Sequence, residues 1–412
     1  MTILVDTTPL IALCDARDEK LLVVLDLKPA YDHPSNLRLG DAVKAFIQTV
    51  FAAVIVLASA RAHAECVNVR MLGATGNGTT DDTAAITKAI QMATIANHRA
   101  GTVCLTAGDY LITSTIVVDD VVGIRLIGEG AATRLIWGGD DHSPLLLLSS
   151  VQEAEISSFQ IIATAAKPLA VGIQCITRGG ATLTSKHNSF VNLLIDGITR
   201  NVNKGFQIGG TPGIDANNDF HLFQNCTVAN YSGIAYSLEN TQVYGVVFLN
   251  SMFLGNASGQ IGVATDQNLY KGGTFTWIGG GGGNNQIVDF SLGDPNSAGI
   301  SIKNAVFEKS ARFIRTGGPS GASFLLEISG VRWSGDALAD DGIAIDFRYP
   351  GPFVIRDSRI GEYSDKALKI SWRPGGNAPG LFVFEGNVVK RASSGPLFIN
   401  RQPTRLADNM ID

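Results

Sequence analysis

The sequence predicts an all-β solenoid, because apolar residues recur in two columns along most of the chain. Members of the first column follow one another at intervals of about 25 to 35 residues, a period typical of stacked repeats. The first column contains Val121, Ile156, Phe190, Phe223, Phe248, Phe275, Ile302, Ile328, Ile355 and Phe384. The second contains Leu126, Ile161, Ile195, Val228, Phe253, Phe307, Trp333, Ile360 and Val389. The surrounding segments have strand-like rather than helical spacing, so each repeat is expected to form one coil.

A polar column between the two apolar columns supports the same arrangement. It contains Asn192, Asn225, Asn250, Asn304 and Asp357. A single coil cannot bury its apolar side, whereas coils stacked about 4.8 Å apart share a continuous core. Like residues then lie in line, and asparagine amides can hydrogen-bond along the axis.

Composition bounds the class of protein. The 412 residues include 46 glycines and 14 prolines, as expected where many tight bends need a positive φ. Charged residues make up 17% of the chain, and the formal net charge is −5. This balance argues against a general nucleic-acid-binding protein, which usually shows a basic face. We therefore expect no nucleic-acid partner.

The first 64 residues do not follow the repeat. Residues 45–58 are mostly apolar, follow Arg38 and Lys44, and precede the small-x-small sequence Ala62-His63-Ala64. This pattern predicts a secretory signal over residues 41–64, cleaved after Ala64, and a secreted or periplasmic protein. The apolar run is short for a membrane span, so no stable membrane insertion is expected after cleavage. The alternative is an uncleaved amphipathic or anchoring helix.

Residues 1–40 are expected to be a leader without a domain of their own. Residues 2–20 resemble the opening strand and helix of PIN-domain nucleases, with Asp6 where that family places its first metal-binding acid. The later acids of that family have no room before the signal-like segment, so a nuclease function is not predicted. A wrongly assigned start or a gene-fusion remnant is the simpler explanation. We expect residues 65–120 to form an N-terminal cap with the first strands, and residues 121–412 to form the solenoid.

Four cysteines lie in the part that follows the predicted signal: Cys66, Cys104, Cys175 and Cys226. An even count in an exported chain permits disulfides. Cys66 and Cys104 lie in strand-like pieces of the cap region and can pair. Cys226 is explained equally well as a buried small side chain or as one half of a bridge. No Cys/His cluster has metal-ligand spacing, so neither a metal nor a cofactor is predicted.

Residues 67–93 read VNVRMLGATGNGTTDDTAAITKAIQMA, a short strand and a glycine-rich turn followed by a helix. Asp81 and Asp82 open the helix, where carboxylates cap free N–H groups and favour the positive dipole end. Its apolar face is formed by Ala85, Ile86, Ala89 and Ile90. The helix is expected to cap the solenoid, because the first coil otherwise exposes a strand edge and the core.

The strings NVRMLGATGNGTTDDTAAITKAI and GTVCLTAGDYLI closely resemble the N-terminal signature of the pectate-lyase-like superfamily, of the rhamnogalacturonase/epimerase-like kind. One departure is Thr106, where the family often carries proline. The resemblance implies a single-stranded right-handed parallel β-helix of about ten coils. It also implies a carbohydrate polymer handled in a groove on the outside of the helix. It does not imply a catalytic set.

Three groups of residues are candidates for chemistry. The first group is Lys303, Glu308 and Arg332, expected on one face within one or two strand spacings. A cation beside a carboxylate suits a lyase, in which it neutralises a uronate, and paired carboxylates suit a hydrolase. The alternative for this group is a solvated ladder of salt bridges.

The second group is Asp219 and His221, with Asp215 beside them and Asp196 one coil earlier. These side chains form a candidate catalytic nest; the alternative is turn chemistry with an inward-facing histidine. The third group is Tyr270 and Trp277 beside the glycine run 279–283, in a coil where Trp277 replaces the ladder asparagine. Aromatic faces there can stack on sugars; the alternative is a flexible loop bulge.

The characteristic Gly-His-Gly and Arg-Ile-Lys motifs of polygalacturonases are absent from the sequence, and the Arg-x-x-Arg cluster of pectate lyases is not evident. The expected function is a secreted carbohydrate-active enzyme that cleaves a polysaccharide as a glycosidase or as a lyase. The alternative is a non-catalytic polysaccharide-binding or structural surface protein. Either a monomer or a trimer is compatible with the sequence.

Overall fold

The computed structural model describes residues 12–14, 21–23, 66–95, 97–210, 216–239, 242–255, 274–292, 299–317, 325–374, 380–390 and 395–412. The chain forms two compact units, Met1–His63 and Ala64–Asp412. In the first unit, β1 (Ala12–Cys14) pairs antiparallel with β2 (Leu21–Val23). The predicted signal segment and Asp6 lie outside the described residues, so signal cleavage stays a prediction.

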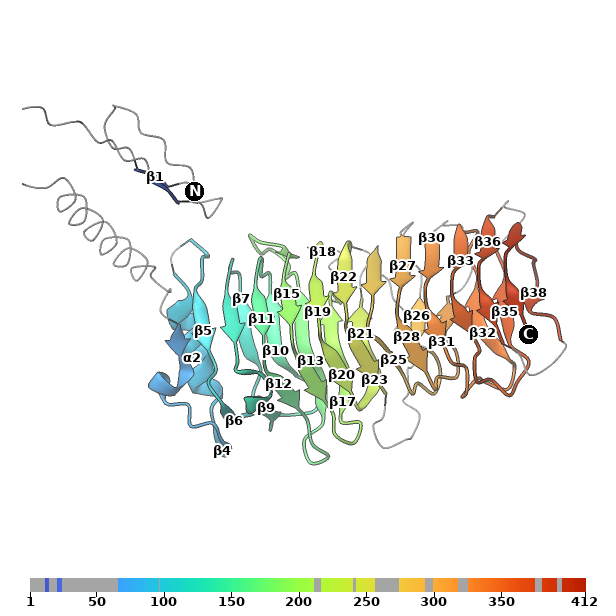
Figure 1. Ribbon diagram of the computed structural model, residues 1–412. Coiled ribbons are helices and arrows are strands. Elements are labelled where there is room, and N and C mark those ends of the chain that lie inside the picture. Colours follow the sequence, from blue (N-terminus) through green and yellow to red (C-terminus); the bar gives the residue numbers. More distant parts are fainter. Residues whose placement is uncertain are drawn as a thin grey trace, which may run out of the picture. The chain divides into compact units, whose positions relative to one another are not determined.

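The second unit is a parallel β-solenoid, in which every coil adds a strand to each of two long sheets (Figure 1). The first long sheet has 13 strands: β3 (Val67–Asn68), β5 (Thr102–Cys104), β8 (Arg125–Ile127), β11 (Glu155–Ser157), β15 (Ser189–Val191), β19 (Leu222–Gln224), β22 (Val246–Leu249), β24 (Phe275–Ile278), β27 (Gly299–Lys303), β30 (Leu325–Ser329), β33 (Phe353–Arg356), β36 (Phe382–Glu385) and β39 (Arg405–Ala407). The predicted fold class is confirmed.

The second long sheet runs beside the first and also has 13 strands. They are β4 (Asn77–Asp81), β6 (Gly108–Ile112), β9 (Thr133–Trp137), β12 (Gln160–Ile162), β16 (Leu194–Asp196), β20 (Thr227–Ala229), β23 (Met252–Leu254), β25 (Gly281–Gly283), β28 (Val306–Glu308), β31 (Arg332–Trp333), β34 (Arg359–Ile360), β37 (Val388–Val389) and β40 (Met410–Ile411).

The remaining side of the solenoid, called the third face below, consists of two five-stranded sheets in the described part of the chain. One contains β7 (Ile116–Asp119), β10 (Pro144–Ser149), β13 (Leu169–Ile176), β17 (Val202–Ile208) and β21 (Tyr231–Leu238). The other contains β26 (Phe290–Leu292), β29 (Ile314–Thr316), β32 (Ile343–Phe347), β35 (Lys369–Trp372) and β38 (Phe398–Ile399). The short strands β14 (Ser185–Lys186) and β18 (Asn218–Asp219) pair beside the first of these sheets.

The strand register confirms most of the two apolar columns and corrects three of their members. Leu126 pairs with Ile156 and therefore belongs to the first column, while Leu135 occupies the second. The 3-10 turn η2 (Gly130–Ala132) lengthens the connection between the columns in this coil, which displaces the predicted Val121 and Leu126.

In β24, the residue that pairs with Phe248 is Trp277 rather than Phe275. Both side chains are buried on the same face of the strand, two residues apart. Sequence periodicity cannot distinguish them. Trp277 therefore stands in the core column and does not replace the ladder asparagine; Gly279 takes that place.

The polar column marks the first residue of the short turn between the two long sheets. Asn192, Asn225, Asn250, Asn304 and Asp357 all have φ between 49° and 53°. Asparagine tolerates this left-handed conformation better than most residues, and Gly279, Gly330 and Gly386 adopt it in other coils. The predicted amide contact exists between Asn225 Nδ2 and Asn192 Oδ1, at 3.1 Å.

The glycine run 279–283 continues the ladder and contains strand β25. Gly282 pairs with Phe253 on one side and with Phe307 on the other, so it occupies the second column as predicted. A Cβ at Gly282 would lie 2.5 Å from the Phe253 ring. The missing side chain lets the rings of Phe253 and Phe307 approach to 5.6 Å between centroids.

The helix α2 (Thr83–Ala93) lies at the β3 end of this unit and buries Ile86, Ala89 and Ile90 (Figure 1). Asp81 Oδ1 accepts a hydrogen bond from the Thr83 N–H at 3.0 Å. Asp82 makes no side-chain cap and instead accepts from the N–H groups of Thr75 and Gly76 in the preceding turn. The expected double cap is therefore corrected, and the role of the helix in covering the solenoid end stays a prediction.

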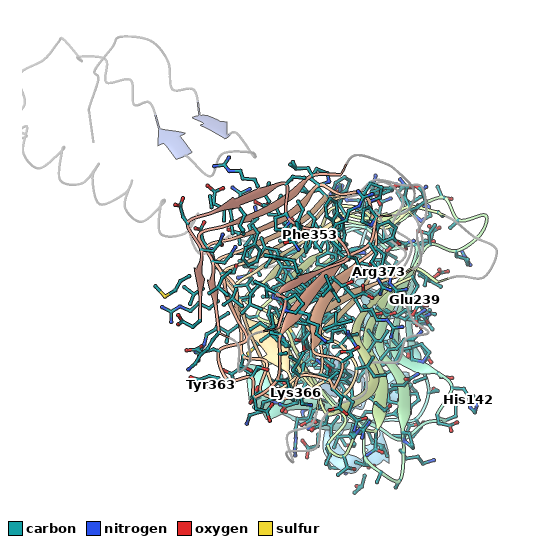
Figure 2. All side chains as sticks on the ribbon, turned by 90° about the vertical axis from the view of Figure 1, so that its right-hand side faces the viewer. His142, Glu239, Phe353, Tyr363, Lys366 and Arg373 are labelled. Atoms are coloured by element: carbon teal, nitrogen blue, oxygen red, sulfur yellow. A yellow bond between two sulfur atoms is a disulfide. The ribbon has the colours of Figure 1, made fainter. Side chains whose placement is uncertain are left out.

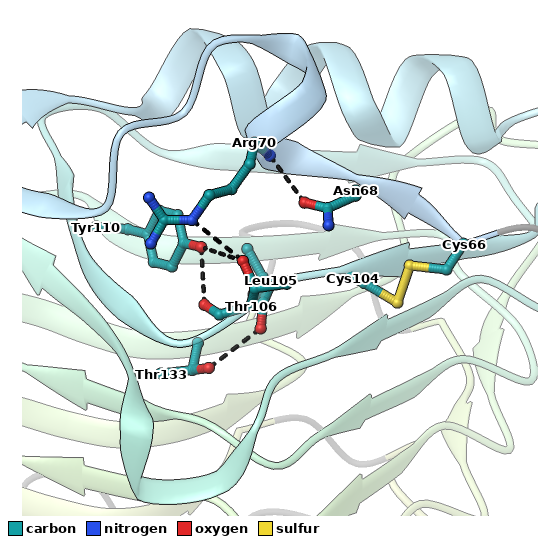
Figure 3. The surroundings of a disulfide bond; sticks show 8 residues. All are labelled: Cys66, Asn68, Arg70, Cys104, Leu105, Thr106, Tyr110 and Thr133. Carbon is teal, nitrogen blue, oxygen red and sulfur yellow. Dashed lines mark hydrogen bonds between the residues drawn. A yellow bond between two sulfur atoms is a disulfide. The ribbon is translucent and has the colours of Figure 1, made fainter.

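Cys66 and Cys104 form a disulfide that joins the neighbouring strands β3 and β5, with the Cα atoms 5.7 Å apart (Figure 3). The sequence permitted this pair, and the structure contains it. Arg70 lies close by, with its guanidinium over the Tyr110 ring. Cys175 and Cys226 are buried free thiols, and Cys226 Sγ contacts the Phe190 carbonyl oxygen at 3.2 Å. Within the residues described, no helix has the length and apolarity needed to cross a bilayer.

We predict that Gly282→Ala lowers the free energy of unfolding by about 1–3 kcal/mol, the usual cost of overpacking a filled core. Urea denaturation checks this value. Gly299→Ala is the matched control, because the nearest atom to a Cβ there lies 4.0 Å away. Equal effects of the two substitutions would contradict the packing argument.

Candidate functional site

The outer surface of the third face is the candidate functional site. From β11 onward two residues separate the strands of the two long sheets within each coil. The described connections between these sheets and the third face are longer and include β14 and β18, except at Asn230 between β20 and β21. Longer connections on a rigid scaffold are where binding and catalytic residues usually gather. Besides the ion pair of Arg178 with Asp119, two clusters of charged side chains lie on this surface in the described part of the chain.

The first group, called the lysine–glutamate cluster, consists of Lys204, Gln207, Ser237 and Glu239. Gln207 lies between the core residues Phe206 and Ile208 of β17, so its side chain points outward. Lys204 Nζ donates to Gln207 Oε1 at 3.3 Å and to Glu239 Oε1. Ser237 Oγ donates to the same Glu239 oxygen at 2.6 Å.

These outward-facing residues have little contact with solvent. The side chains of Lys204 and Glu239 are 15% and 20% exposed. Poorly hydrated charges are costly unless they are paired and hydrogen-bonded, which this cluster provides. Gly210 contributes to the enclosure, because a Cβ there would lie 2.6 Å from Glu239 Oε2. The cluster therefore holds a cation and a carboxylate in a fixed and sheltered geometry.

The second group, called the arginine cluster, consists of Asp346, Arg348 and Arg373. Asp346 faces outward from β32, and Arg348 and Arg373 follow directly after β32 and β35. Their Nη2 atoms lie 2.7 Å and 2.6 Å from Asp346 Oδ2. Burial alone would raise the pKa of Asp346, but hydrogen bonds from both arginines hold it below its ordinary value.

The two clusters share one side of the solenoid. Figure 2, which looks along the stack from the opposite end to α2, shows Arg373 and Glu239 on the same side of the molecule. Tyr363 and Lys366 lie on a different side in the same view. A polymer that runs along the third face can therefore meet both clusters.

The structure separates the first predicted group of site residues. Lys303 lies on the first long sheet, where its Nζ is 2.9 Å from Glu327 Oε2. Glu308 and Arg332 lie together on neighbouring strands of the second long sheet, β28 and β31. Arg332 pairs with Glu362 and lies over the Tyr363 ring. These ion pairs resemble the solvated salt bridges that were the alternative interpretation of this group. The catalytic roles of Lys303, Glu308 and Arg332 stay predictions.

The second predicted group is buried. Asp219 Oδ1 accepts from the Tyr244 N–H at 3.1 Å, and burial raises the pKa of Asp219. His221 faces inward in register with Val246, which is the inward alternative. Its Nδ1 accepts from the Asn188 N–H at 3.3 Å, while Nε2 is buried without a hydrogen-bond partner in the described structure. Burial lowers the pKa of His221 to about 3.

Asp196 lies apart from Asp219 and His221, on the second long sheet. Its Oδ1 accepts from the Ile198 N–H and from Asn230 Nδ2, both at 2.7 Å. Asp196 thus stabilises the turn after β16. Asp215 lies outside the described residues.

The third predicted group is only partly described, because Tyr270 lies outside the described residues. Trp277 is 1% exposed, and its ring stacks on Phe248 at 4.8 Å between centroids. A surface platform for sugars at Trp277 is therefore corrected to a core position. The indole also lines a cavity of about 80 Å³ between β21 and β26.

A buried polar network lies beside this cavity. Asp289 accepts hydrogen bonds from Asn285 Nδ2 at 2.8 Å and Trp333 Nε1 at 3.1 Å, and from Ser310 Oγ. The Tyr231 hydroxyl donates to Asn285 Oδ1. Burial raises the pKa of Asp289 to about 7. In the ranges that the structure describes, no three His, Cys, Asp or Glu side chains are grouped to hold a metal ion.

Both third-face clusters escaped the sequence analysis. The signal that could have found them is the alternation Phe206-Gln207-Ile208 and Ile345-Asp346-Phe347, in which one polar residue stands between core residues. Chain lengths before these strands vary from coil to coil, so a fixed spacing did not align them.

We predict that Asp289 makes the protein less stable as pH rises. Its folded pKa of about 7 exceeds the unfolded value of about 3.9, so stability falls between about pH 4 and about pH 7 and stays lower above. Asp289→Asn should abolish this loss of unfolding free energy. The loss amounts to a few kcal/mol over the whole pH range, at about 1.4 kcal/mol for each unit of pKa difference. Urea unfolding across this range checks it. The exposed Asp336→Asn is the control, and an unchanged slope in Asp289→Asn would refute the assignment.

We predict the opposite dependence for His221. Its folded pKa of about 3 lies below the unfolded value of about 6.5, so stability is complete above that value and falls as the solution is acidified. His221→Gln should weaken this loss by a few kcal/mol. The measurement is the same unfolding series, with the exposed His98→Gln as control. Identical acid profiles for His221→Gln and the parent protein would exclude this role.

A family model described as Rhamnogalacturonase A/epimerase, pectate lyase-like, matches residues 66–242 of the chain. The resemblance predicted from the N-terminal signature is confirmed over this part. No curated protein sequence matches the chain significantly.

Solved structures share the fold at low sequence identity. The A-module of a mannuronan C-5 epimerase from Azotobacter vinelandii is 14% identical and has a TM-score of 0.52, covering 84% of this chain and 99% of its own. The catalytic unit of a GH87 alpha-1,3-glucanase from Streptomyces thermodiastaticus is 14% identical with a TM-score of 0.50, over 79% of this chain and 58% of its own. A Geobacillus virus E2 protein is 15% identical with a TM-score of 0.48, over 96% and 66%.

The chain thus spans 66% of the virus protein and 58% of the glucanase unit. At these identities the likeness concerns the fold alone. The structural neighbours of this chain are parallel β-helix epimerases and glycoside hydrolases, and its residues 66–242 match the rhamnogalacturonase/epimerase model of the pectate-lyase-like group.

Proposed function

We propose that this protein is a carbohydrate-active enzyme that cleaves a polysaccharide bound along the third face. The family match to residues 66–242 supports this class. Two proteins of the same fold are named for mannuronan and for alpha-1,3-glucan, which are both carbohydrate polymers. The lysine–glutamate cluster supports the location, because it is outward-facing, polar and sheltered.

The observation that carries the reaction class is the contact of Lys204 with Glu239 and Gln207. In β-elimination of a uronate, a base takes the C5 proton and negative charge grows on the carboxylate. The C4–C5 double bond then forms as the C4–O bond breaks, and the leaving oxygen takes up a proton. A fixed cation beside that carboxylate stabilises the charge. Lys204 is placed to supply the cation, and Glu239 and Gln207 hold its ammonium group in position. We therefore favour elimination over hydrolysis.

Hydrolysis would need two carboxylates that flank the scissile bond. Among the described residues of the two clusters, the carboxylates are Glu239 and Asp346, and both are engaged by cations. The same engagement would suit a non-catalytic polysaccharide-binding protein, which is the second candidate function.

The proposed place of action is outside the cytoplasm. The predicted signal over residues 41–64 supports export. The Cys66–Cys104 disulfide supports it as well, because structural disulfides persist mainly in oxidising compartments.

The purified protein should be incubated with a panel of acidic and neutral polysaccharides. Reducing ends and the ultraviolet absorbance of unsaturated uronates are followed together. New reducing ends with absorbance support elimination, and reducing ends without absorbance establish hydrolysis. If neither signal appears and the polymer is still retained by the protein, the binding function replaces the enzyme.

We predict that Lys204→Ala lowers kcat by about 100-fold, the usual cost of removing one charge-stabilising donor. Lys204→Arg should recover part of the rate. Glu239→Gln should lower the rate less, because it acts by positioning Lys204, and should alter the pH profile. Product formation under saturating polymer gives kcat.

Lys303→Ala is the matched control, since Lys303 also pairs with a glutamate on an outer surface. Loss of activity in Lys303→Ala, with full activity in Lys204→Ala, would move the active site to the residues predicted from the sequence. Melting curves confirm that each variant is folded.

A further inference from the structure

The arginine cluster repeats one position on two neighbouring coils. Phe347 pairs with Trp372 in the ladder, and Arg348 and Arg373 follow these residues directly. The Arg373 N–H donates to the Phe347 carbonyl at 2.8 Å, which continues the ladder to this point. Stacked coils are about 4.8 Å apart, so two guanidinium groups leave the third face side by side.

Asp346 fixes both guanidinium groups from below. Its carboxylate accepts from Arg348 Nε at 3.0 Å and from Arg373 Nε at 3.3 Å, in addition to both Nη2 atoms. These bonds do not use Nη1 of either arginine. A guanidinium that is already oriented loses less entropy when it binds a ligand.

The charge presented to solvent is positive. The Asp346 side chain is 5% exposed, whereas Arg348 and Arg373 are 29% and 44% exposed. One arginine neutralises a single carboxylate, so the second arginine leaves an excess of one positive charge in the cluster. Pairing of Asp346 alone does not require the second arginine.

Guanidinium forks match planar or tetrahedral oxyanions such as carboxylate and sulfate. We infer that Arg348 and Arg373 form an anion-binding subsite that takes a carboxylate or sulfate group of an acidic polysaccharide. The inference rests on the proposed function for the path of the polymer along the third face. It adds the substrate class, because a neutral glycan offers no partner for these charges.

The test measures affinity of the full chain for three polymers by electrophoresis through gels that contain them. Polygalacturonate supplies carboxylates, dextran sulfate supplies sulfates, and unmodified dextran is neutral. Arg373→Gln and Arg348→Gln should each weaken binding to an acidic polymer by about tenfold, as expected for a lost charge-assisted hydrogen bond. For every variant, mobility in dextran should equal that variant's own mobility in a polymer-free gel.

Arg356→Gln is the matched control. Arg356 lies between Arg348 and Arg373 in the sequence, but in β33 of the first long sheet. Its side chain is 48% exposed and lies 3.4 Å from Glu327. The substitution removes the same charge from a different side of the solenoid. Equal weakening by Arg356→Gln would show that only net charge matters and would overturn the subsite.

Each single variant leaves Asp346 one arginine, and a melting curve shows whether it folds. If Arg373→Gln is unfolded, the double variant Asp346→Asn/Arg373→Gln removes the unpaired carboxylate and is tested instead. Weakened retention in polygalacturonate alone assigns the subsite to carboxylates, and weakened retention in dextran sulfate alone assigns it to sulfates. Unchanged retention of both arginine variants in both acidic polymers overturns the inference.

The result is separable from the enzyme assay. If the arginine variants lose retention but no polymer yields product, the subsite stands and the proposed reaction fails. If the protein cleaves a polymer and the arginine variants retain full affinity for it, the reaction stands and the subsite fails.

Discussion

The parallel hydrogen-bonded register between successive coils is the constraint on which the rest of this structure depends. Because each strand pairs in register with the one before, every side chain stands in line with its counterpart in the next coil. Phe223, Phe248 and Trp277 stack face to face for this reason, with centroids 4.9 Å and 4.8 Å apart. The same constraint requires a residue with positive φ where the chain turns between the long sheets from β11 onward. Asparagine, aspartate or glycine stands there in these coils, except for Ser158 between β11 and β12.

The register also places a few polar side chains among the apolar residues of the core. Asn188 and His221 are buried at inward positions, and Asp289 is partly buried and hydrogen-bonded to Asn285 and Trp333. Buried polar groups are tolerated when they are hydrogen-bonded and uncharged. Burial pushes the pKa of the histidine down and that of the aspartate up. Both shifts favour the neutral form, which is the form that a solenoid core accommodates.

The third face differs from the two long sheets in the length of the chain that leads to and from it. Its outward positions collect polar side chains that pair with each other: Lys204 with Glu239, and Asp346 with two arginines. Such pairs contribute little net stability when they are only partly desolvated. Their fixed geometry is the reason for proposing that they recognise a ligand. The polymer-handling function proposed above is placed on this face on that ground.

The sequence by itself determined the solenoid, most of both apolar columns and the turn asparagines, because the spacing between the columns within a coil is short and nearly constant. It permitted the Cys66–Cys104 disulfide without deciding it. It failed where spacing was ambiguous, as for Phe275 and Trp277, and where an insertion changed it, as at Leu126. Only the tertiary structure brought Lys204 to Glu239 and Arg373 to Asp346. These two contacts join different coils through connections of unequal length, and the sequence pattern alone does not show which outward residues meet. For the same reason the structure placed Lys303 apart from Arg332, although their spacing predicted one face.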